Sequence, residues 1–356
     1  MITERLDLLR SKILKETLKV SFFRSLFLDR ANRILFLSLL ALAFYLTTSL
    51  FFPLCVLLMG PIIWGVPHII SSLRYNTQFN TKTSERKKAV IFQSMIWLAV
   101  FSYRIAVDIY NQNLFISSYP LIFESICLVL SFAGQIYFVR QFNWKLILFS
   151  GLFSFLIYST YVFPIQTALV LLIGHNYIPL YAWFKSCQQS KDFQIFSTVT
   201  SIYILLSIAI YFGLFDSLYS IYSPQGQIQF LNWNYADVVK SFGANPSDYQ
   251  FWFHIVSLYA FSQAMHYFFW VKAIPENYQP QQHPPSFKCS QNRLANDFGS
   301  TSIYALAALV FLGLVYWLFF EFQTARLVYF SIASYHGFME ISALPFLKSN
   351  RKELSK

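Results

Sequence analysis

Four histidines lie inside strongly apolar segments, where hydrocarbon would offer an imidazole no partner. They are His68, His175, His266 and His336. The stretch around His266, residues 251–275, reads FWFHIVSLYAFSQAMHYFFWVKAIP and is long enough to cross a bilayer as a helix, with Gln263 on the same face as His266. A histidine in a membrane segment usually faces the protein interior and binds something there. These four side chains are therefore the candidate functional residues.

The four histidines are predicted to lie at similar depths in their segments. Each is followed by a basic residue that marks the end of its segment, after six residues for His266 and His68, ten for His175 and twelve for His336. At about 1.5 Å per residue these offsets differ by roughly one to two helical turns, which side-chain reach and helix tilt absorb. We expect the four imidazoles to meet.

Imidazoles that meet in a pocket poor in carboxylates suit iron, copper or zinc. A metal held by histidines keeps positions open for dioxygen or substrate. The predicted metal is non-haem iron, with another transition metal or haem as the alternatives. The predicted ligands are His68, His175, His266 and His336.

Two further side chains are predicted to take part in the chemistry of this site. Glu340 lies one helical turn after His336 on the same face. It is placed to act as a metal ligand or as a carboxylate that fixes the tautomer of a ligating ring. Tyr267 directly follows His266 in the sequence. We predict Glu340 and Tyr267 as the catalytic residues.

A purely structural role is the alternative for each histidine, because a single membrane histidine often links neighbouring helices through a hydrogen bond. Four histidines at similar depth, on segments predicted to run in the same direction, favour a shared site. His254 and His283 do not share this depth, so we predict that neither of them binds the metal.

The composition identifies a polytopic membrane protein. Of the 356 residues, 56% are hydrophobic, 20% are aromatic and only 12% are charged, against about 25% charged in soluble domains. The net charge of +11 comes from basic residues in short loops between apolar runs, which is typical of topology signals and not of a nucleic-acid-binding face. The four scattered cysteines indicate neither a disulfide framework nor a zinc knuckle.

The pattern of apolar runs predicts an all-α, polytopic transmembrane helical bundle with about ten spans. Residues 1–33 are predicted as a cytoplasmic, interfacial amphipathic helix, residues 34–347 as a single transmembrane domain and residues 348–356 as a basic cytoplasmic tail. The expected spans cover residues 34–51, 54–73, 89–107, 120–139, 146–163, 164–184, 195–214, 251–275, 302–320 and 325–347.

Several local features are predicted along these spans. Pro61 and Pro67 should kink the second span just ahead of His68 and free backbone carbonyls. Arg104 and Glu124 are placed to pair between the third and fourth spans. Residues 215–250 are expected to cap the outer face, and the proline- and glutamine-rich residues 275–293 are expected to lack regular structure.

The basic residues also predict the orientation of the chain. With the N-terminus inside, all of the 27 basic residues except Arg104, Lys240 and Arg326 lie on the cytoplasmic side. We therefore predict a bacterial-type inner membrane location with both termini in the cytoplasm. The expected partners are the lipid bilayer and a lipid-soluble small molecule, and no nucleic acid. The 40 phenylalanines suit a pocket for a long apolar or polyene substrate.

One short motif carries a resemblance to a known family. The turn Gly65-Val66-Pro67-His68 resembles the G-x-P-H signature of the Brp/Blh family of membrane carotene-cleaving dioxygenases, in which histidines on several helices hold a non-haem iron. The resemblance implies that the four histidines are iron ligands. The family motif continues with Gly, Asp and a second His, whereas this chain continues with residues 69–72, IISS.

The sequence around the other three histidines resembles a different group. The contexts GHNYIPLYAW, QAMHYFFWVKAIPE and YHGFMEISAL look like those of a bacterial family of multi-histidine polytopic membrane proteins. Our leading hypothesis is an integral membrane metalloprotein, a non-haem iron oxidase or oxygenase that acts on a lipid-soluble substrate. The alternatives are a haem-binding electron-transfer protein and a non-catalytic transporter with Arg104, Glu124, His336 and Glu340 along a polar path.

Overall fold

The protein is almost entirely helical in the computed structural model. The model describes residues 2–65, 67–72, 84–110, 118–139, 144–187, 190–217, 229–230, 233–234, 239, 249–277, 285–298, 308, 312–313, 315, 337 and 340–341. Within them, the only strands are β1 (Gln229–Phe230) and β2 (Trp233–Asn234), which pair antiparallel. The predicted all-α class is confirmed. His336 and nearly all of the ninth and tenth expected spans lie outside the described residues.

The helices follow one another closely along the chain. The first group comprises α1 (Ile2–Thr17), α2 (Ser21–Leu28), α3 (Arg30–Phe51), α4 (Pro53–Gly60), α6 (Ser84–Tyr110), α7 (Ser118–Val139) and α8 (Trp144–Val162). The second comprises α9 (Pro164–Gly174), α10 (Ile178–Ser186), α11 (Ser190–Tyr211), α14 (Tyr249–Phe268), α15 (Ile274–Asn277) and α16 (Phe287–Phe298). Three short segments of other helical geometry interrupt this series. The π-helical segments η1 (Pro61–Gly65) and η4 (Phe269–Ala273) follow α4 and α14, and the 3₁₀ turn η3 (His175–Tyr177) follows α9.

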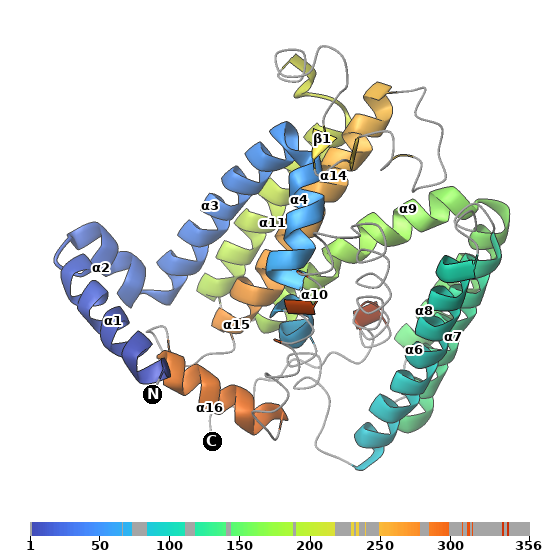
Figure 1. Cartoon of the computed structure of the whole chain (residues 1–356), viewed down its shortest axis with the longest axis horizontal. Coiled ribbons are helices and arrows are strands. Elements are labelled where there is room, and N and C mark those ends of the chain that lie inside the picture. The colour runs from blue at the N-terminus through green and yellow to red at the C-terminus, as the bar shows by residue number, and fades with distance from the viewer. Residues whose placement is uncertain are drawn as a thin grey trace.

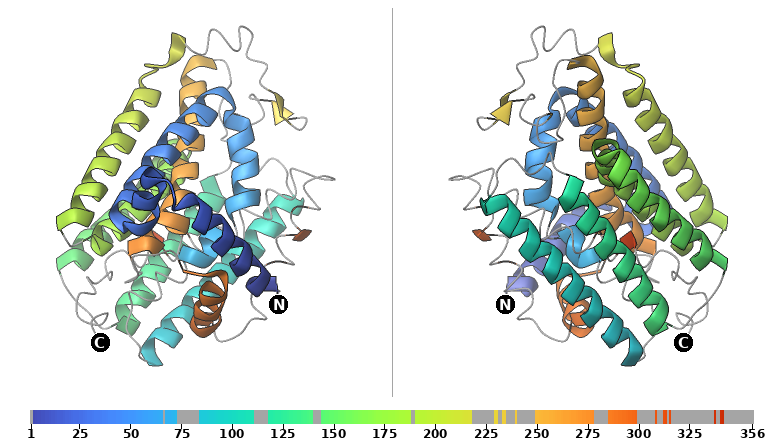
Figure 2. Two further views of the ribbon diagram at one scale, coloured as in Figure 1. Left: turned by 90° about the vertical axis from the view of Figure 1, so that its left-hand side faces the viewer. Right: turned by 90° about the vertical axis from the view of Figure 1, so that its right-hand side faces the viewer.

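Helix α14 stands at the centre of the main body of the protein. It packs against α3, α4, α9 and α11, and these helices surround it in Figure 1. Helices α6, α7 and α8 form a second group to one side, connected to the main body through α9 (Figures 1 and 2). The largest buried side chains of the main body include Trp183, Trp270, Tyr203, Phe261 and Phe269.

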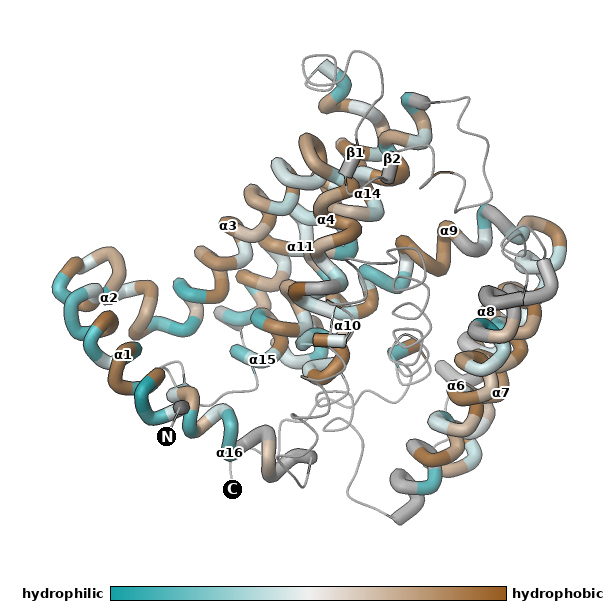
Figure 3. The backbone as a smooth tube through the Cα atoms, viewed as in Figure 1, coloured by the Kyte–Doolittle hydropathy of each residue, from teal (hydrophilic) through white to brown (hydrophobic). Residues whose placement is uncertain are grey.

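Two described helices are long and apolar enough to cross a membrane, Arg30–Phe51 and Asp192–Tyr211. A third candidate is the broken pair Pro53–Gly60 and Ile63–Ser72, which bends by 48°. The described part of the chain therefore supports two or three spans rather than the expected ten. Along the tube in Figure 3, α3 begins with hydrophilic residues and continues into an apolar stretch.

Helix α14 differs from the apolar span that the sequence predicts, because it is not among these membrane-length candidates. Its faces are covered by protein, and residues 253–267 are all buried. Several of these buried residues are polar, among them Ser257, Ser262, Gln263 and His266. A helix that contacts protein on every side can carry polar groups as long as neighbouring helices supply their partners.

Two Phe-Pro pairs make the tight turns that join neighbouring helices. Phe52 links α3 to α4 with φ −137° and ψ 52°, and Phe163 links α8 to α9 with φ −132° and ψ 64°. A proline disfavours helical geometry in the residue before it, yet fits well in the first turn of the next helix. Both turns lie where the sequence predicts them. The predicted kink in the second span is also present, since the chain passes through η1 before His68.

The N-terminal region differs from the single amphipathic helix expected over residues 2–30. The helix breaks at residues 18–20, which gives the separate helices α1 and α2. The Asp29 side chain accepts a hydrogen bond from the Ala31 backbone N–H at 2.9 Å, so α3 begins at Arg30. The predicted boundary between residues 33 and 34 consequently lies inside α3.

The proline- and glutamine-rich segment contains a helix that the sequence interpretation missed. Helix α16 begins at Phe287, and the Asp7 carboxylate of α1 accepts hydrogen bonds from the backbone N–H groups of Phe287 and Lys288 at 2.7 and 3.1 Å. The Lys288 ammonium also lies 3.0 Å from a Glu4 carboxylate oxygen. A carboxylate stabilises a helix N-terminus by satisfying its unpaired N–H groups. The expectation of irregular structure was therefore wrong for residues 287–293.

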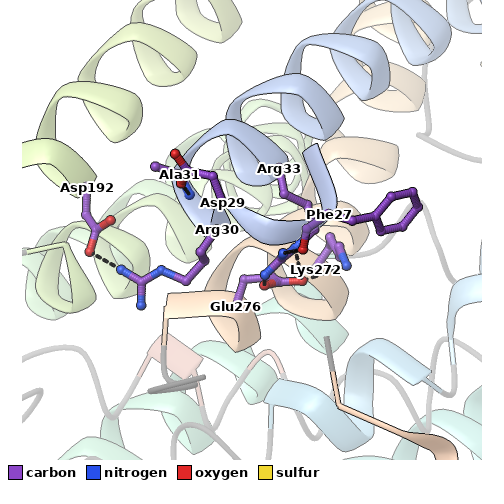
Figure 4. Close-up of polar contacts among 8 residues, drawn as sticks. All are labelled: Phe27, Asp29, Arg30, Ala31, Arg33, Asp192, Lys272 and Glu276. Carbon is purple, nitrogen blue, oxygen red and sulfur yellow. Dashed lines mark hydrogen bonds and ion pairs between the residues drawn. The ribbon is translucent and has the colours of Figure 1, made fainter. Parts of the chain in front are cut away.

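A group of ion pairs joins three helix ends at the basic end of the main body (Figure 4). Arg33 donates to both Glu276 carboxylate oxygens, at 3.2 and 2.6 Å, and to the Phe27 carbonyl at 2.9 Å. Lys272 lies 2.8 Å from the same carboxylate. Arg30 pairs with Asp192 at 2.5 Å. These contacts bring the start of α3 and the start of α11 to η4 and α15, which follow the end of α14, so α14 runs antiparallel to both.

The predicted ion pair between α6 and α7 is confirmed. Arg104 donates to both carboxylate oxygens of Glu124, at 2.5 and 2.7 Å. The two helices also approach closely at Gly134, where an added Cβ would lie 2.2 Å from the Phe92 ring. Glycine is needed there because any side chain would overlap that ring.

Replacing Arg33 by Met is expected to cost about 3–5 kcal/mol of unfolding free energy, because it leaves the Glu276 carboxylate buried without its main partner. The Arg33 and Glu276 side chains are only 5% and 6% exposed. Arg30→Met is the matched control, since its pair with Asp192 is more exposed, and it should cost clearly less. Denaturant titration in detergent, followed by circular dichroism, measures both. Equal losses in the two variants would contradict this ranking.

The same carboxylate predicts how stability depends on pH. Glu276 lies just beyond the expected span 251–275; its burial favours a higher pKa, but hydrogen bonds and charges from Arg33 and Lys272 outweigh burial and hold the pKa below its ordinary value of 4.5. Because the pKa is lower in the folded state than in the unfolded state, ionisation of Glu276 favours folding. This stabilisation is complete above pH 4.5 and is lost as the pH falls below that value. The unfolding midpoint of the wild type should therefore drop more steeply on acidification than that of Glu276→Gln. Parallel curves would contradict the expectation.

Gly134→Ala is expected to destabilise the α6–α7 contact by about 1–3 kcal/mol, because the new methyl group overlaps the Phe92 ring. Gly151→Ala on α8 is the control, since an added Cβ there meets nothing within 4 Å. It should be neutral or slightly stabilising because alanine favours helix. Thermal unfolding of the two variants distinguishes a steric effect from a general effect of alanine.

Candidate metal centre

The structure brings three of the four predicted histidines together in the core. The ring centroids of His175 and His266 lie 4.7 Å apart, and those of His68 and His266 lie 5.3 Å apart. His68 and His266 are 1% and 0% exposed. The fourth, His336, lies outside the described residues. Segments that are far apart in the sequence thus place their imidazoles in one cluster.

Each of these histidines lies beside a departure from α-helical geometry. Segment η1 ends three residues before His68, the 3₁₀ turn η3 begins at His175, and η4 begins three residues after His266. Prolines contribute to two of these departures, because Pro61 begins η1 and Pro67 follows its end, and Pro179 lies in the first turn of α10 after η3. Segments of π-helix occur frequently at functional sites, where they change the direction in which a side chain points.

The backbone fixes which nitrogen of two of the rings can act as a ligand. Nδ1 of His68 lies 3.2 Å from the carbonyl oxygen of Trp64, and Nδ1 of His175 lies 3.4 Å from that of Leu172. A carbonyl oxygen only accepts, so each Nδ1 carries the proton. Nε2 is then the nitrogen with a lone pair suited to a metal.

Glu340 completes a group with the composition of a metal site. One ligand atom each from His175, His266 and Glu340 lies within 4.8 Å of the other two. Atoms that bind one metal at about 2.0–2.2 Å lie roughly 3–4 Å apart, so side-chain adjustments of about 1 Å suffice. Glu340 is 1% exposed, and Ile341 beside it packs against the core of α7 and α8. The segment that carries Glu340 therefore contacts both groups of helices.

The sequence expectation of an all-histidine ligand set differs from this grouping. His68 is not a member of the compact group, although its ring contacts that of His266. It also lies against the Tyr267 ring, with centroids 4.4 Å apart. Glu340, predicted as a catalytic residue and as a possible ligand, lies beside the two imidazoles. The Tyr267 ring contacts the rings of His68 and His266, with centroids 4.4 and 5.9 Å apart.

Buried amide side chains surround the cluster. The Gln263 amide donates to the Tyr267 hydroxyl at 2.6 Å, and the Asn176 amide donates to the Ser262 hydroxyl at 2.9 Å. Gly60 of α4 lies beside the Tyr267 ring, where an added Cβ would come within 3.3 Å of it. These contacts hold α14 against η3 and α4 at the level of the histidines.

Ser72 is a site residue that the sequence interpretation missed. Its hydroxyl donates to Oε1 of Glu340 at 2.6 Å, and Ser72 itself is 0% exposed. Ser72 follows His68 by four residues, so both lie on one face of the same helix. That spacing was visible in the sequence, but its partner Glu340 lies 268 residues away.

His254, which was predicted not to bind the metal, has a different partner. Its Nε2 lies 2.6 Å from a carboxylate oxygen of Asp216. It precedes His266 by twelve residues on α14, which places it about 18 Å away along the helix axis. Gly213, with φ +69°, lies beside this pair. His283 lies outside the described residues.

Comparisons with known proteins reveal no relative. No family model, no curated protein and no solved structure matches this chain. The resemblance of the turn at residues 65–68 to the Brp/Blh family therefore stays a prediction. Function is inferred below from the chemistry of the site.

Proposed function

We propose that this protein is an integral membrane metalloprotein, a non-haem iron oxygenase or oxidase that acts on a lipid-soluble substrate. His175, His266 and Glu340 hold the metal in this proposal. His68 lies next to them and His336 is a further predicted ligand. The single observation that carries the proposal is the convergence of two imidazoles and one carboxylate within 4.8 Å in the core.

The burial of Glu340 supports a bound cation at this position. A carboxylate removed from water is costly unless a cation or several hydrogen bonds compensate it. Among the described residues, Ser72 donates to Oε1 of Glu340, and Oε2 has no hydrogen-bond partner. Within the described part of the chain, Glu340 interacts with the Ser72 hydroxyl and with no lysine or arginine, and its neighbours in the compact group are imidazoles. A metal ion between the three side chains would supply the missing positive charge.

The ligand types favour iron. Two histidines and one carboxylate with open positions form the set that non-haem iron oxygenases use, whereas zinc shares this set in some hydrolases. Iron bound in this way would supply the redox chemistry with which dioxygen is activated. The side chains of the protein would orient the metal, and the enclosing helices would exclude water from it.

The membrane setting is part of the proposal. The two long apolar helices and the broken third candidate support a membrane protein, and the apolar runs of the whole sequence are the basis for proposing about ten spans. We propose a bacterial-type inner membrane with both termini in the cytoplasm, since the basic residues at the start of α3 and in η4 lie at one end of the main body, near the charged start of α11. A site buried within such helices is reached most directly by a molecule dissolved in the bilayer, which favours a long apolar or polyene substrate.

The geometry weighs against the two alternatives. A haem iron holds its axial imidazoles on opposite faces of a broad macrocycle, and rings with centroids only 4.7 and 5.3 Å apart leave no space for a macrocycle between them. A polar transport path through Arg104 and Glu124 is not favoured either. Arg104 on α6 and Glu124 on α7 form an ion pair with each other. Glu340 accepts a hydrogen bond from Ser72 at the histidine cluster.

Elemental analysis of the purified protein tests the proposal. The wild type is expected to hold about one iron per chain, and His175→Ala, His266→Ala and Glu340→Ala should each lose most of it, because each removes a ligand. His254→Ala is the matched control on the same helix as His266 and should keep the metal. Circular dichroism confirms that each variant is folded. Metal content that is absent from the wild type, or unchanged in all three site variants, would refute the proposal.

A further inference from the structure

A short hydrogen bond determines how Glu340 faces the imidazoles. The Ser72 hydroxyl donates to Oε1 of Glu340 at 2.6 Å, within the usual range for a hydroxyl donor and an oxygen acceptor. Ser72 is 0% exposed and Glu340 is 1% exposed, so water does not compete for this hydrogen bond. One oxygen of the carboxylate is therefore engaged, and the other, Oε2, has no hydrogen-bond partner among the described residues.

The helix that carries Ser72 is itself held in place at the site. Residues 67–72 form one helical segment that follows the kink, with His68 at its start and Ser72 at its end. The neighbouring Ser71 donates its hydroxyl to the backbone carbonyl of Trp270 in η4, three residues beyond Tyr267. One serine thus fastens the segment to the backbone after His266, and the other contacts the carboxylate.

We infer that Ser72 is the positioning residue of this metal site, an inference that rests on the proposed function. Its hydroxyl fixes the rotamer of Glu340 so that Oε2 faces the imidazoles of His175 and His266 as the metal-binding oxygen. Ser72 does not bind the metal, and it acts only through Glu340. Groups that hold a ligand in this way typically raise metal affinity by about 10- to 100-fold.

A matched pair of variants separates the effect of the hydroxyl group from the effect of side-chain shape. Threonine and valine have nearly the same shape, but only threonine can donate to Glu340. The full-length protein in detergent, stripped of metal, is titrated with Co²⁺, whose visible absorption reports ligand type and geometry. Ser72→Val should weaken Co²⁺ binding by about 10- to 100-fold and change the spectrum, whereas Ser72→Thr should retain both. Ser72→Ala should behave like Ser72→Val.

Ser207→Ala is the control for the loss of a buried serine hydroxyl away from the site. Ser207 on α11 is buried, and its hydroxyl donates to the backbone carbonyl of Tyr203 on the same helix at 2.8 Å. Its Co²⁺ affinity and spectrum should match those of the wild type. The unfolding midpoints of the metal-free variants show whether any loss of affinity merely follows a loss of fold.

The possible outcomes distinguish this inference from the proposed function. A wild type that binds no Co²⁺ overturns the proposed function and, with it, this inference. A wild type that binds Co²⁺ with Ser72→Val indistinguishable from it overturns this inference alone. Equal weakening in Ser72→Val and Ser72→Thr also overturns it, because the hydroxyl would then not matter. Weakening in Ser72→Val alone supports it.

Discussion

The enclosure of α14 by other helices is the constraint on which the rest of the structure depends. A helix covered on every side exposes no polar group to water, so each polar side chain on it needs a partner from another element. Ser262 finds Asn176 on η3, and His254 finds Asp216 after α11. At the level of His266 the neighbours are the rings of His68 and His175. The candidate metal centre is the point on α14 where imidazoles from two other segments lie against His266.

Departures from regular helix turn the histidines toward one another. A regular α-helix repeats every 3.6 residues and fixes the direction of each side chain. The π-helical turns before His68 and after His266, and the 3₁₀ turn that starts at His175, change these directions locally. Such turns have poorer backbone hydrogen bonding than an α-helix, and they persist because tertiary contacts compensate them. The hydrogen bond from Ser71 to the backbone of η4 is one such contact.

Features set by neighbouring residues could be predicted from the sequence, and features set by distant residues could not. The Phe-Pro turns at Phe52 and Phe163 and the kink before His68 follow from proline itself, and opposite charges on adjacent segments predicted the Arg104–Glu124 pair. Helix α16 could not be predicted, because Asp7, which caps it, lies 280 residues away in the sequence. The hydrogen bond between Ser72 and Glu340 could not be predicted either, because the two residues are 268 positions apart in the sequence. The sequence also did not show that residues 253–267 of α14 are buried on every side, because the helices that cover them come from distant parts of the chain.

The ion pair between Arg33 and Glu276 has a consequence for how the chain assembles during synthesis. Its two members are 243 residues apart, so α3 emerges from the ribosome long before its partner carboxylate exists. An unpaired arginine is costly in hydrocarbon, so the first turn of α3 has to remain in contact with water until residue 276 has been translated. Helix α15, which carries Glu276, then pairs with Arg33 and closes this end of the main body. The contact that anchors the start of α3 therefore forms only late in synthesis, after α14 has been made.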